Sequence, residues 1–378
     1  MTAFAAAAEV LRQGMATRAF PAASVEVGTR ENITWREAFG TLTYDDSAPP
    51  TDQNTIFDLA SLTKVISTTT LVMRSVDDGV VGLDDLVSQW IPEWRSSDRA
   101  GVTLRDLLAH SSGLTAYLPY YRDLAGRAEF QAAIATSPLE YTPRSQAIYS
   151  DLGFMLLGFI LEDARNRSIS AWPGAMDPAV LLGSQFKRVS SYVTSDPLTF
   201  LPPRDWRDRT APTEHDAWRG RTPVGEVHDE NAWALGGVAG HAGLFGTAGA
   251  VGAFARAVLH TVLGTHVLAK ATTMREFIQR TRIPDSSRAL GWDTMLPTSS
   301  CGTLMSPSAI GHTGFTGTSL WIDWERDLYI VLLTNRVHGG RDNTQIQQVR
   351  PRFHDAVLAE LYPGTESTTN IQLPKANF

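Results

Sequence analysis

The chain has 378 residues, of which 43% are hydrophobic and 19% charged, and its formal net charge is −7. This composition fits one large globular domain or two interleaved ones. The acidic balance argues against a nucleic-acid partner, because proteins that bind nucleic acid usually carry a basic face. Cys301 is the single cysteine, so we expect no intramolecular disulfide and no cysteine-based metal site.

The first residues do not have the pattern of an export signal. Residues 1–13 are rich in alanine but include Glu9 and Arg12, and no basic segment precedes an unbroken apolar stretch. The longest apolar run, residues 153–161, is too short to span a bilayer. We therefore expect a cytoplasmic protein with no membrane partner, or a periplasmic or secreted one if a signal has been removed.

Hydrophobic periodicity predicts the elements in chain order. In the first half we expect a helix over 3–17, strands over 21–28 and 33–44, a buried helix from Ser61 to about Asp78 ended by Gly79, and helices over 104–109, 129–135 and 150–165. In the second half we expect helices over 247–263 and 270–280, strands over 309–323 and 328–335 joined as a hairpin, and a helix over 344–361.

Two stretches lack a clear period. Residues 166–235 are rich in Pro, Asp, Arg and Trp, and we interpret them as a long loop that shapes or covers a site. The polar tail, residues 365–378, is expected to be poorly ordered.

Strands and a helix at each end enclose a helical middle, which predicts an α/β or α+β domain built from both termini. We expect residues 1–85 and 245–378 to form this domain, residues 86–244 to form an inserted, mainly helical region, and the active site to lie between them.

Ser61 and Lys64 form a Ser-x-x-Lys motif at the start of a predicted buried helix. Residues i and i+3 share one face of a helix, so the lysine lies beside the serine hydroxyl. A serine needs a base to become a nucleophile, and a lysine can act as one if burial lowers its pKa. A second copy, Ser184 and Lys187, lies among prolines and glycines and is interpreted as chance.

Tyr149 and Asp151 precede the apolar helix of residues 152–165. A tyrosine beside Lys64 can share in proton transfer, and Asp151 can hold the ammonium by a charge-assisted hydrogen bond. The alternative is an ordinary helix start, with Ser150 or Asp151 as N-cap and Tyr149 packed in the core.

The third element is His312-Thr313-Gly314, within a glycine-rich strand. Gly311, Gly314 and Gly317 recur every third residue, and glycine in a strand often marks a close approach of another group to the backbone. We interpret this as a strand along which a substrate lies; the alternative is a bulged strand.

In this order the three motifs resemble those of the class C β-lactamase and penicillin-binding-protein superfamily, over about residues 15–362. The resemblance implies a β-lactamase-like fold, an antiparallel sheet flanked by helices. It also implies Ser61 as nucleophile, Lys64 and Tyr149 as its proton-transfer partners, and the backbone N–H groups of Ser61 and Phe315 as oxyanion hole. Asp151, His312, Thr313, Gly314, His241 and Arg336 would support the substrate, and no metal or cofactor is needed.

Two departures from the family pattern bear on substrate. Asp151 replaces the usual Asn, and an anion there raises the pKa of Lys64, which favours Tyr149 as the base. His312 replaces a lysine that helps hold a substrate carboxylate, and a histidine is mostly neutral at pH 7. This resembles the family VIII carboxylesterases. Arg336 or Arg341 is then the candidate cation.

The sequence segments 227–232 and 237–243 resemble those of a branch of this superfamily that includes D-alanyl-D-alanine carboxypeptidases and muropeptide amidases. His228, Asp229, Glu230 and His241 fit no strong metal-binding spacing, and we interpret them as a hydrogen-bonded loop that lines the pocket.

We therefore expect a serine hydrolase that forms an acyl-enzyme on Ser61, foremost a carboxylesterase for small to medium acyl esters. The alternatives are an amidase or D-alanyl-D-alanine carboxypeptidase on peptidoglycan fragments, a β-lactamase, a transacylase with an acceptor other than water, or a slowly acylated sensor without turnover. The expected partner is a small-molecule ester or amide, and a homo-oligomer is compatible with the sequence.

Overall fold

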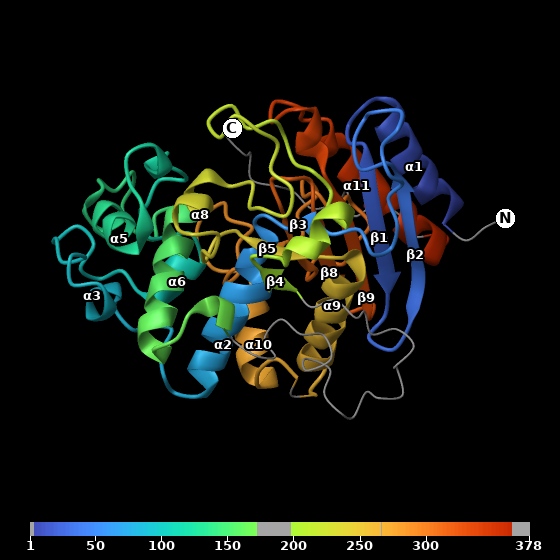
Figure 1. Ribbon diagram of the computed structural model, residues 1–378. Coiled ribbons are helices and arrows are strands. Elements are labelled where there is room, and N and C mark those ends of the chain that lie inside the picture. Colours follow the sequence, from blue (N-terminus) through green and yellow to red (C-terminus); the bar gives the residue numbers. More distant parts are fainter. Residues whose placement is uncertain (1–3, 172–197, 266, 365–378) are drawn as a thin grey trace.

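The computed structural model describes residues 4–171, 198–265 and 267–364. Its main element is a six-stranded antiparallel sheet with the strand order β2-β1-β9-β8-β7-β6. The strands are β1 (Ala22–Gly28), β2 (Ile33–Gly40), β6 (Asp293–Thr294), β7 (Ile310–Thr313), β8 (Ser319–Asp323) and β9 (Leu328–Thr334). β1 from the N-terminal part lies beside β9 from the C-terminal part (Figure 1), which confirms the predicted antiparallel sheet.

Helices cover both faces of this sheet. α1 (Ala5–Ala16) and α11 (Ile346–Leu361) pack together, and their apolar residues share one core with Ala23, Val25 and Val27 of β1. α9 (Ala248–Val262) packs on the opposite face, where Glu26 of β1 points. A Cβ at Gly252 of α9 would lie 1.9 Å from the Glu26 carboxylate, so only glycine allows this close approach.

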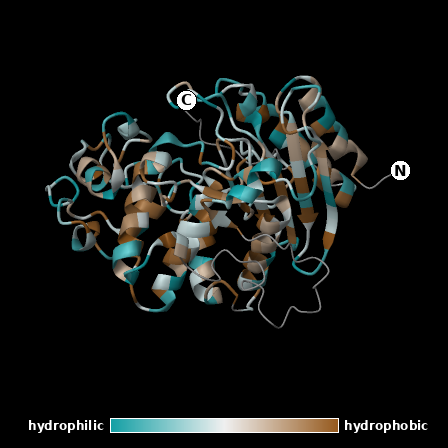
Figure 2. Ribbon diagram, viewed as in Figure 1, coloured by the Kyte–Doolittle hydropathy of each residue, from teal (hydrophilic) through white to brown (hydrophobic). Residues whose placement is uncertain are grey.

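The second part of the molecule is helical around α6 (Asp151–Arg165), in which every residue from Leu152 to Leu161 is buried. Figure 2 shows the hydropathy of the residues along the ribbon. Around it lie α3 (Val87–Trp90), α4 (Leu104–Leu108), η2 (Tyr120–Arg122), α5 (Gly126–Thr136), η3 (Ile169–Ala171) and α8 (Glu230–Ala234). α10 (Ala271–Ile278) packs against α9. A small antiparallel sheet has the order β3 (Phe57–Asp58), β5 (Leu244–Gly246), β4 (Thr199–Phe200). Two further 3-10 turns are η5 (Arg204–Arg209) and η6 (Arg336–Gly339).

The helix expected from Ser61 to about Asp78 is confirmed, with one irregularity. Residues 62–63 are α-helical, then a π-helical segment, η1 (Lys64–Thr69), continues into α2 (Thr70–Asp77). Gly79 follows with a left-handed φ of 69°, as expected of a residue that ends a helix. A π-helical segment is rare and frequently marks a functional site.

The single strand expected over residues 309–323 is wrong. β7 and β8 are two strands joined by a tight turn, in which the Gly314 N–H donates to the Thr318 carbonyl oxygen at 2.7 Å and Gly317 adopts a φ of 113°. The glycines are therefore explained by a turn and by close packing, without a substrate. Gly317 lies in the turn, and a Cβ at Gly311 would lie 2.2 Å from the Trp321 ring.

In the described parts of residues 166–235 the elements are short, in keeping with the expected loop. The rest of that stretch, with Ser184 and Lys187, and the tail over 365–378 lie outside the described residues. Within the described ranges, no helix has the length and apolar character needed to cross a membrane. The division at residues 85 and 245 stays a prediction.

Candidate active site

Ser61 follows β3 on a strained turn. Ala60, directly before it, has a φ of 46°, which is uncommon for a residue other than glycine. The Asp58 carboxylate accepts the Ala60 N–H at 2.8 Å and so holds this conformation. Strained backbone of this kind persists when the surrounding contacts fix it, and it clusters at active sites.

Lys64 is fully buried and points at Ser61. Its ammonium nitrogen lies 3.1 Å from the Ser61 hydroxyl, 2.6 Å from Asp151 Oδ1 and 3.2 Å from the His241 carbonyl oxygen. These three acceptors match the three N–H bonds of an ammonium. Burial lowers the pKa of Lys64, but Asp151 and Tyr149 outweigh it, so the pKa lies above its ordinary value.

Tyr149 lies between Lys64 and the cavity wall, with its ring 4.7 Å from the lysine nitrogen. Ser150 caps α6 by accepting the Gly153 N–H, while Asp151 pairs with Lys64, so the helix start and the contact with lysine coexist. Burial raises the pKa of Tyr149; the Lys64 ammonium lowers it, and Asp151 raises it again, for a net rise. The Tyr149 hydroxyl is buried and has no hydrogen-bond partner among the described residues.

The two expected oxyanion donors are both available. Within the described chain, neither the Ser61 nor the Phe315 backbone N–H donates a hydrogen bond. Phe315 lies in the turn between β7 and β8, and both residues line one cavity of about 740 Å³. Two unpaired N–H groups facing a common space can stabilise an oxyanion.

The third motif begins in β7 just beyond its short pairing with β6, which covers Ile310 and Gly311. His312 is buried, and its Nδ1 lies 2.8 Å from the Thr313 carbonyl oxygen, which requires the proton on Nδ1 and leaves Nε2 as an acceptor. Burial, then Lys64 and Arg288, hold the pKa of His312 well below its usual value, so the ring is neutral. Thr313 and Gly314 also line the cavity.

Arg288 is a cavity residue that no motif had indicated. Its guanidinium lies 5.1 Å from the centre of the Tyr149 ring, and in the described structure no hydrogen bond or ion pair engages that group. It precedes β6 on an irregular segment, where neither periodicity nor spacing reports a function. Only its charge, 24 positions before His312, could have drawn attention to it.

Arg336 and Arg341, the expected cations, are held by the protein itself. Arg336 donates to the carbonyl oxygens of Phe315, Arg341 and Asn343 at 2.7–2.8 Å. The Arg341 side chain bonds the carboxylates of Glu214 and Glu230. Both line the cavity, as does Arg350, which donates to the carbonyl oxygens of Gly314 and Thr318. Of these four arginines, Arg288 is the one whose guanidinium makes no hydrogen bond or ion pair within the described residues.

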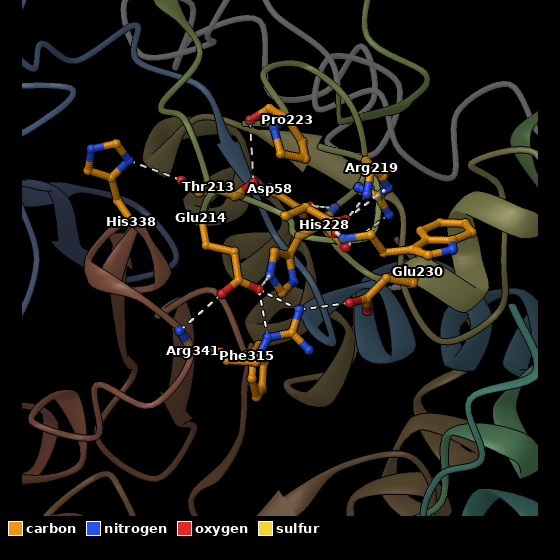
Figure 3. A network of polar contacts seen from close by, with 12 residues as sticks. Asp58, Thr213, Glu214, Arg219, Pro223, His228, Glu230, Phe315, His338 and Arg341 are labelled. Carbon is orange, nitrogen blue, oxygen red and sulfur yellow. Dashed lines mark hydrogen bonds and ion pairs between the residues drawn. The ribbon is translucent and has the colours of Figure 1, made fainter. Parts of the chain in front are cut away.

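The histidines of segments 227–232 and 237–243 each form a hydrogen bond with an acidic side chain. His241 Nε2 lies 2.9 Å from Asp229, and His228 Nε2 lies 2.7 Å from Glu214, which Arg341 joins to Glu230 (Figure 3). In the part of the chain that the structure describes, no three His, Cys, Asp or Glu residues are arranged to hold a metal ion.

Comparisons with known proteins identify the family of the chain. The family model described as "Beta-lactamase" matches residues 7–175 and 195–350. A putative D-alanyl-D-alanine carboxypeptidase from Salmonella gallinarum is 33% identical over 321 residues, covering 78% of this chain and 72% of the relative.

Two solved structures share the fold. EstCE1, described as a hydrolase with promiscuous acyltransferase activity, is 21% identical with a TM-score of 0.67 and covers 93% of this chain and 97% of its own. A class C β-lactamase is 17% identical with a TM-score of 0.70 and covers 93% and 97%. With its fold and the family match over most of its length, the chain belongs to the β-lactamase family.

Proposed function

We propose that this protein hydrolyses a small amide or ester whose leaving group carries a carboxylate, through an acyl-enzyme on Ser61. The observation that carries the substrate class is Arg288, whose guanidinium shares a cavity with Ser61, lies against the Tyr149 ring and makes no hydrogen bond or ion pair within the described residues. A guanidinium is suited to bind a carboxylate through paired hydrogen bonds.

In the first step the Ser61 oxygen attacks the substrate carbonyl and its proton passes to the Lys64–Tyr149 pair. Both members have raised pKa values, so the reactive form is the pair that has lost one proton, and the two groups titrate together. The N–H groups of Ser61 and Phe315 receive the oxyanion. The pair then protonates the leaving group, and water attacks the acyl-enzyme by the reverse proton path.

A C-terminal D-amino acid meets these requirements, since its carboxylate lies next to the scissile amide. Neutral esters, which the sequence favoured because His312 replaces a cationic lysine, therefore become the second candidate substrates. A cation in the cavity supplies the charge that His312 lacks. The curated relative named as a putative D-alanyl-D-alanine carboxypeptidase supports the same class.

A carboxylesterase for neutral esters is the second candidate. The neutral His312 ring and the half-exposed Phe315 beside the oxyanion donors favour it, since they offer an uncharged surface to an acyl group. Acyl transfer to an alcohol or amine would use the same acyl-enzyme.

The test compares diacetyl-L-Lys-D-Ala-D-Ala with p-nitrophenyl butyrate and nitrocefin, following turnover and intact mass, with Ser61→Ala as control. We expect release of D-Ala at a higher kcat/KM than butyrate release, and no turnover in Ser61→Ala. Fast ester turnover without D-Ala release would establish the second candidate. Turnover that survives in Ser61→Ala would exclude both.

A further inference from the structure

Asp58 contacts neighbours of both proposed oxyanion donors, the backbone N–H groups of Ser61 and Phe315. Its carboxylate is 3% exposed, and each of its oxygens accepts a backbone N–H: Oδ1 that of Ala60 at 2.8 Å, and Oδ2 that of His228 at 2.6 Å. Burial raises the pKa of this carboxyl, and the N–H groups of His228 and Ala60 oppose that rise. A buried carboxylate is costly to keep in a fold, and groups of this kind concentrate where function requires them.

The first contact fixes Ser61. The Ala60 N–H belongs to the residue directly before the nucleophile, and the hydrogen bond holds Ala60 at its left-handed φ of 46°. The direction of the Ser61 N–H depends on this peptide, because the two dihedral angles of Ala60 orient it.

The second set of contacts fixes Phe315 from the backbone side. The Thr316 hydroxyl donates to the Asp58 carbonyl oxygen at 2.7 Å, and the Thr318 hydroxyl donates to the Leu59 carbonyl oxygen at 3.0 Å. The turn that carries Phe315 is therefore bonded directly to β3, the strand that leads into Ser61.

The third set fixes Phe315 through its side chain. The His228 ring, whose backbone is held by Asp58, stacks on the Phe315 ring with centroids 5.6 Å apart and planes 22° apart (Figure 3). The Arg336 guanidinium also lies against that ring, 4.4 Å from its centre, and donates to the Phe315 carbonyl oxygen. Glu214 bonds the far side of the His228 ring, and Arg341 ties Glu214 to Glu230.

We propose that Asp58 is a positioning residue that sets the separation and direction of the two oxyanion donors, the N–H groups of Ser61 and Phe315. Its carboxylate acts on Ser61 through Ala60 and on Phe315 through His228, and its backbone carbonyl oxygen accepts the Thr316 hydroxyl of the turn that carries Phe315. The inference rests on the proposed acyl-enzyme chemistry, because it assigns these N–H groups to the oxyanion.

Asp58→Asn tests this without changing the size of the side chain. An amide offers one acceptor oxygen and one NH₂ donor, so one of the two backbone N–H groups would face another donor. We expect kcat/KM to fall by up to about 100-fold, the loss that a misplacement near 1 Å can cause, with KM within about threefold of wild type, since the contact acts on the transition state.

The decisive measurement is the affinity for an arylboronic acid, which forms a tetrahedral adduct with the Ser61 oxygen and places one oxygen between the two donors. We expect Asp58→Asn to weaken the boronate by the same factor as kcat/KM. Thr316→Val, which removes the hydroxyl bond to the Asp58 backbone carbonyl oxygen and leaves the carboxylate contacts in place, should give a smaller loss of the same kind. It tests the link between residue 58 and the turn that carries Phe315 if Asp58→Asn does not fold.

Asp355→Asn is the matched control. Asp355 in α11 also accepts two backbone N–H groups, those of Thr303 and Leu304, and burial raises its pKa too, but it does not line the cavity. Equal losses in the Asp58 and Asp355 variants, or a boronate affinity unchanged in both Asp58→Asn and Thr316→Val, would overturn this inference alone. A wild-type chain that forms no boronate adduct on Ser61 would overturn the proposed function with it.

Discussion

The two sides of the catalytic cavity differ in how far the protein satisfies its own polar groups. On the Lys64 side every donor has an acceptor: Ser61, Asp151 and the His241 carbonyl share the ammonium. On the side formed by His312 and Arg288, His312 Nε2 has no hydrogen-bond partner among the described residues, and no hydrogen bond or ion pair there engages the Arg288 guanidinium. Since a buried unsatisfied polar group costs about 1–3 kcal/mol, the first side is assembled before substrate arrives, and the second gains its partners from the substrate.

The largest expected effect lies on the satisfied side. Lys64→Met should lower kcat/KM by about 10²–10⁴-fold, because it removes a proton-transfer partner, and should destabilise the fold by about 3 kcal/mol, because it leaves Asp151 without its counterion. Urea unfolding and acylation rates measure the two effects. Adding Asp151→Leu should restore stability and leave activity lost; recovery of activity would contradict the assignment.

On the unsatisfied side, Arg288→Gln should raise KM for a carboxylate-bearing substrate on the order of tenfold to a hundredfold, as expected for losing a charge-assisted pair of about 1.5–3 kcal/mol. Neutral p-nitrophenyl butyrate should be hydrolysed as before. A matched change at an exposed arginine outside the cavity, Arg122→Gln, should alter neither. Equal effects of Arg288→Gln on both substrates would show that Arg288 supports the site without recognising charge.

Asp151→Asn should change how kcat/KM depends on pH. Asp151 raises the pKa of both Lys64 and Tyr149, and the reactive pair is the form that has lost a proton. Removing the charge should therefore shift the rising limb of the kcat/KM profile to lower pH, by about one unit or more for a close opposite charge. Profiles from pH 5 to 10 measure this, and an unmoved or upward-shifted limb would refute the assignment.

The smallest effect is expected for the hydrogen bonds that join Glu214 to His228 and Arg341. Burial opposes ionisation of Glu214, but the hydrogen bonds from His228 and Arg341 prevail and lower its pKa from 4.5 to about 2. A carboxylate with a lowered pKa stabilises the fold above its unfolded pKa, and this stability is lost as pH falls. Between pH 4.5 and 2, wild type should therefore lose stability more steeply than Glu214→Gln in fluorescence-monitored urea unfolding. Parallel curves would contradict the pairing.

The sequence was most informative where a pattern repeats along one element. The sheet with its flanking helices follows from apolar periodicity, and the neighbours Ser61, Lys64, Tyr149 and Asp151 follow from motifs that begin helices. The turn at Gly314–Thr318 was missed because a glycine-rich strand and a glycine-rich turn have the same composition, and only the φ of Gly317 distinguishes them.

Arg288 and Asp58 were missed for a different reason. The fold brings each of them to residues far away in the chain: Arg288 lies against the Tyr149 ring, and Asp58 meets His228 and Thr316, which are 170 and 258 residues distant. No local pattern encodes such contacts, since they depend on how irregular segments return to β3.

The pairing of β1 with β9 has a consequence for synthesis of the chain. Residues 22–28 can pair with β2 soon after both strands are synthesised, but their other edge has no partner strand until residues 328–334 have been made. At about 5–20 residues per second on a ribosome, the roughly 300 intervening residues take on the order of 15–60 s. For that time a hairpin rich in alanine and valine carries an unpaired edge, which is a template for aggregation. A newly made chain therefore carries this open edge for longer than a protein of this size with local pairing would.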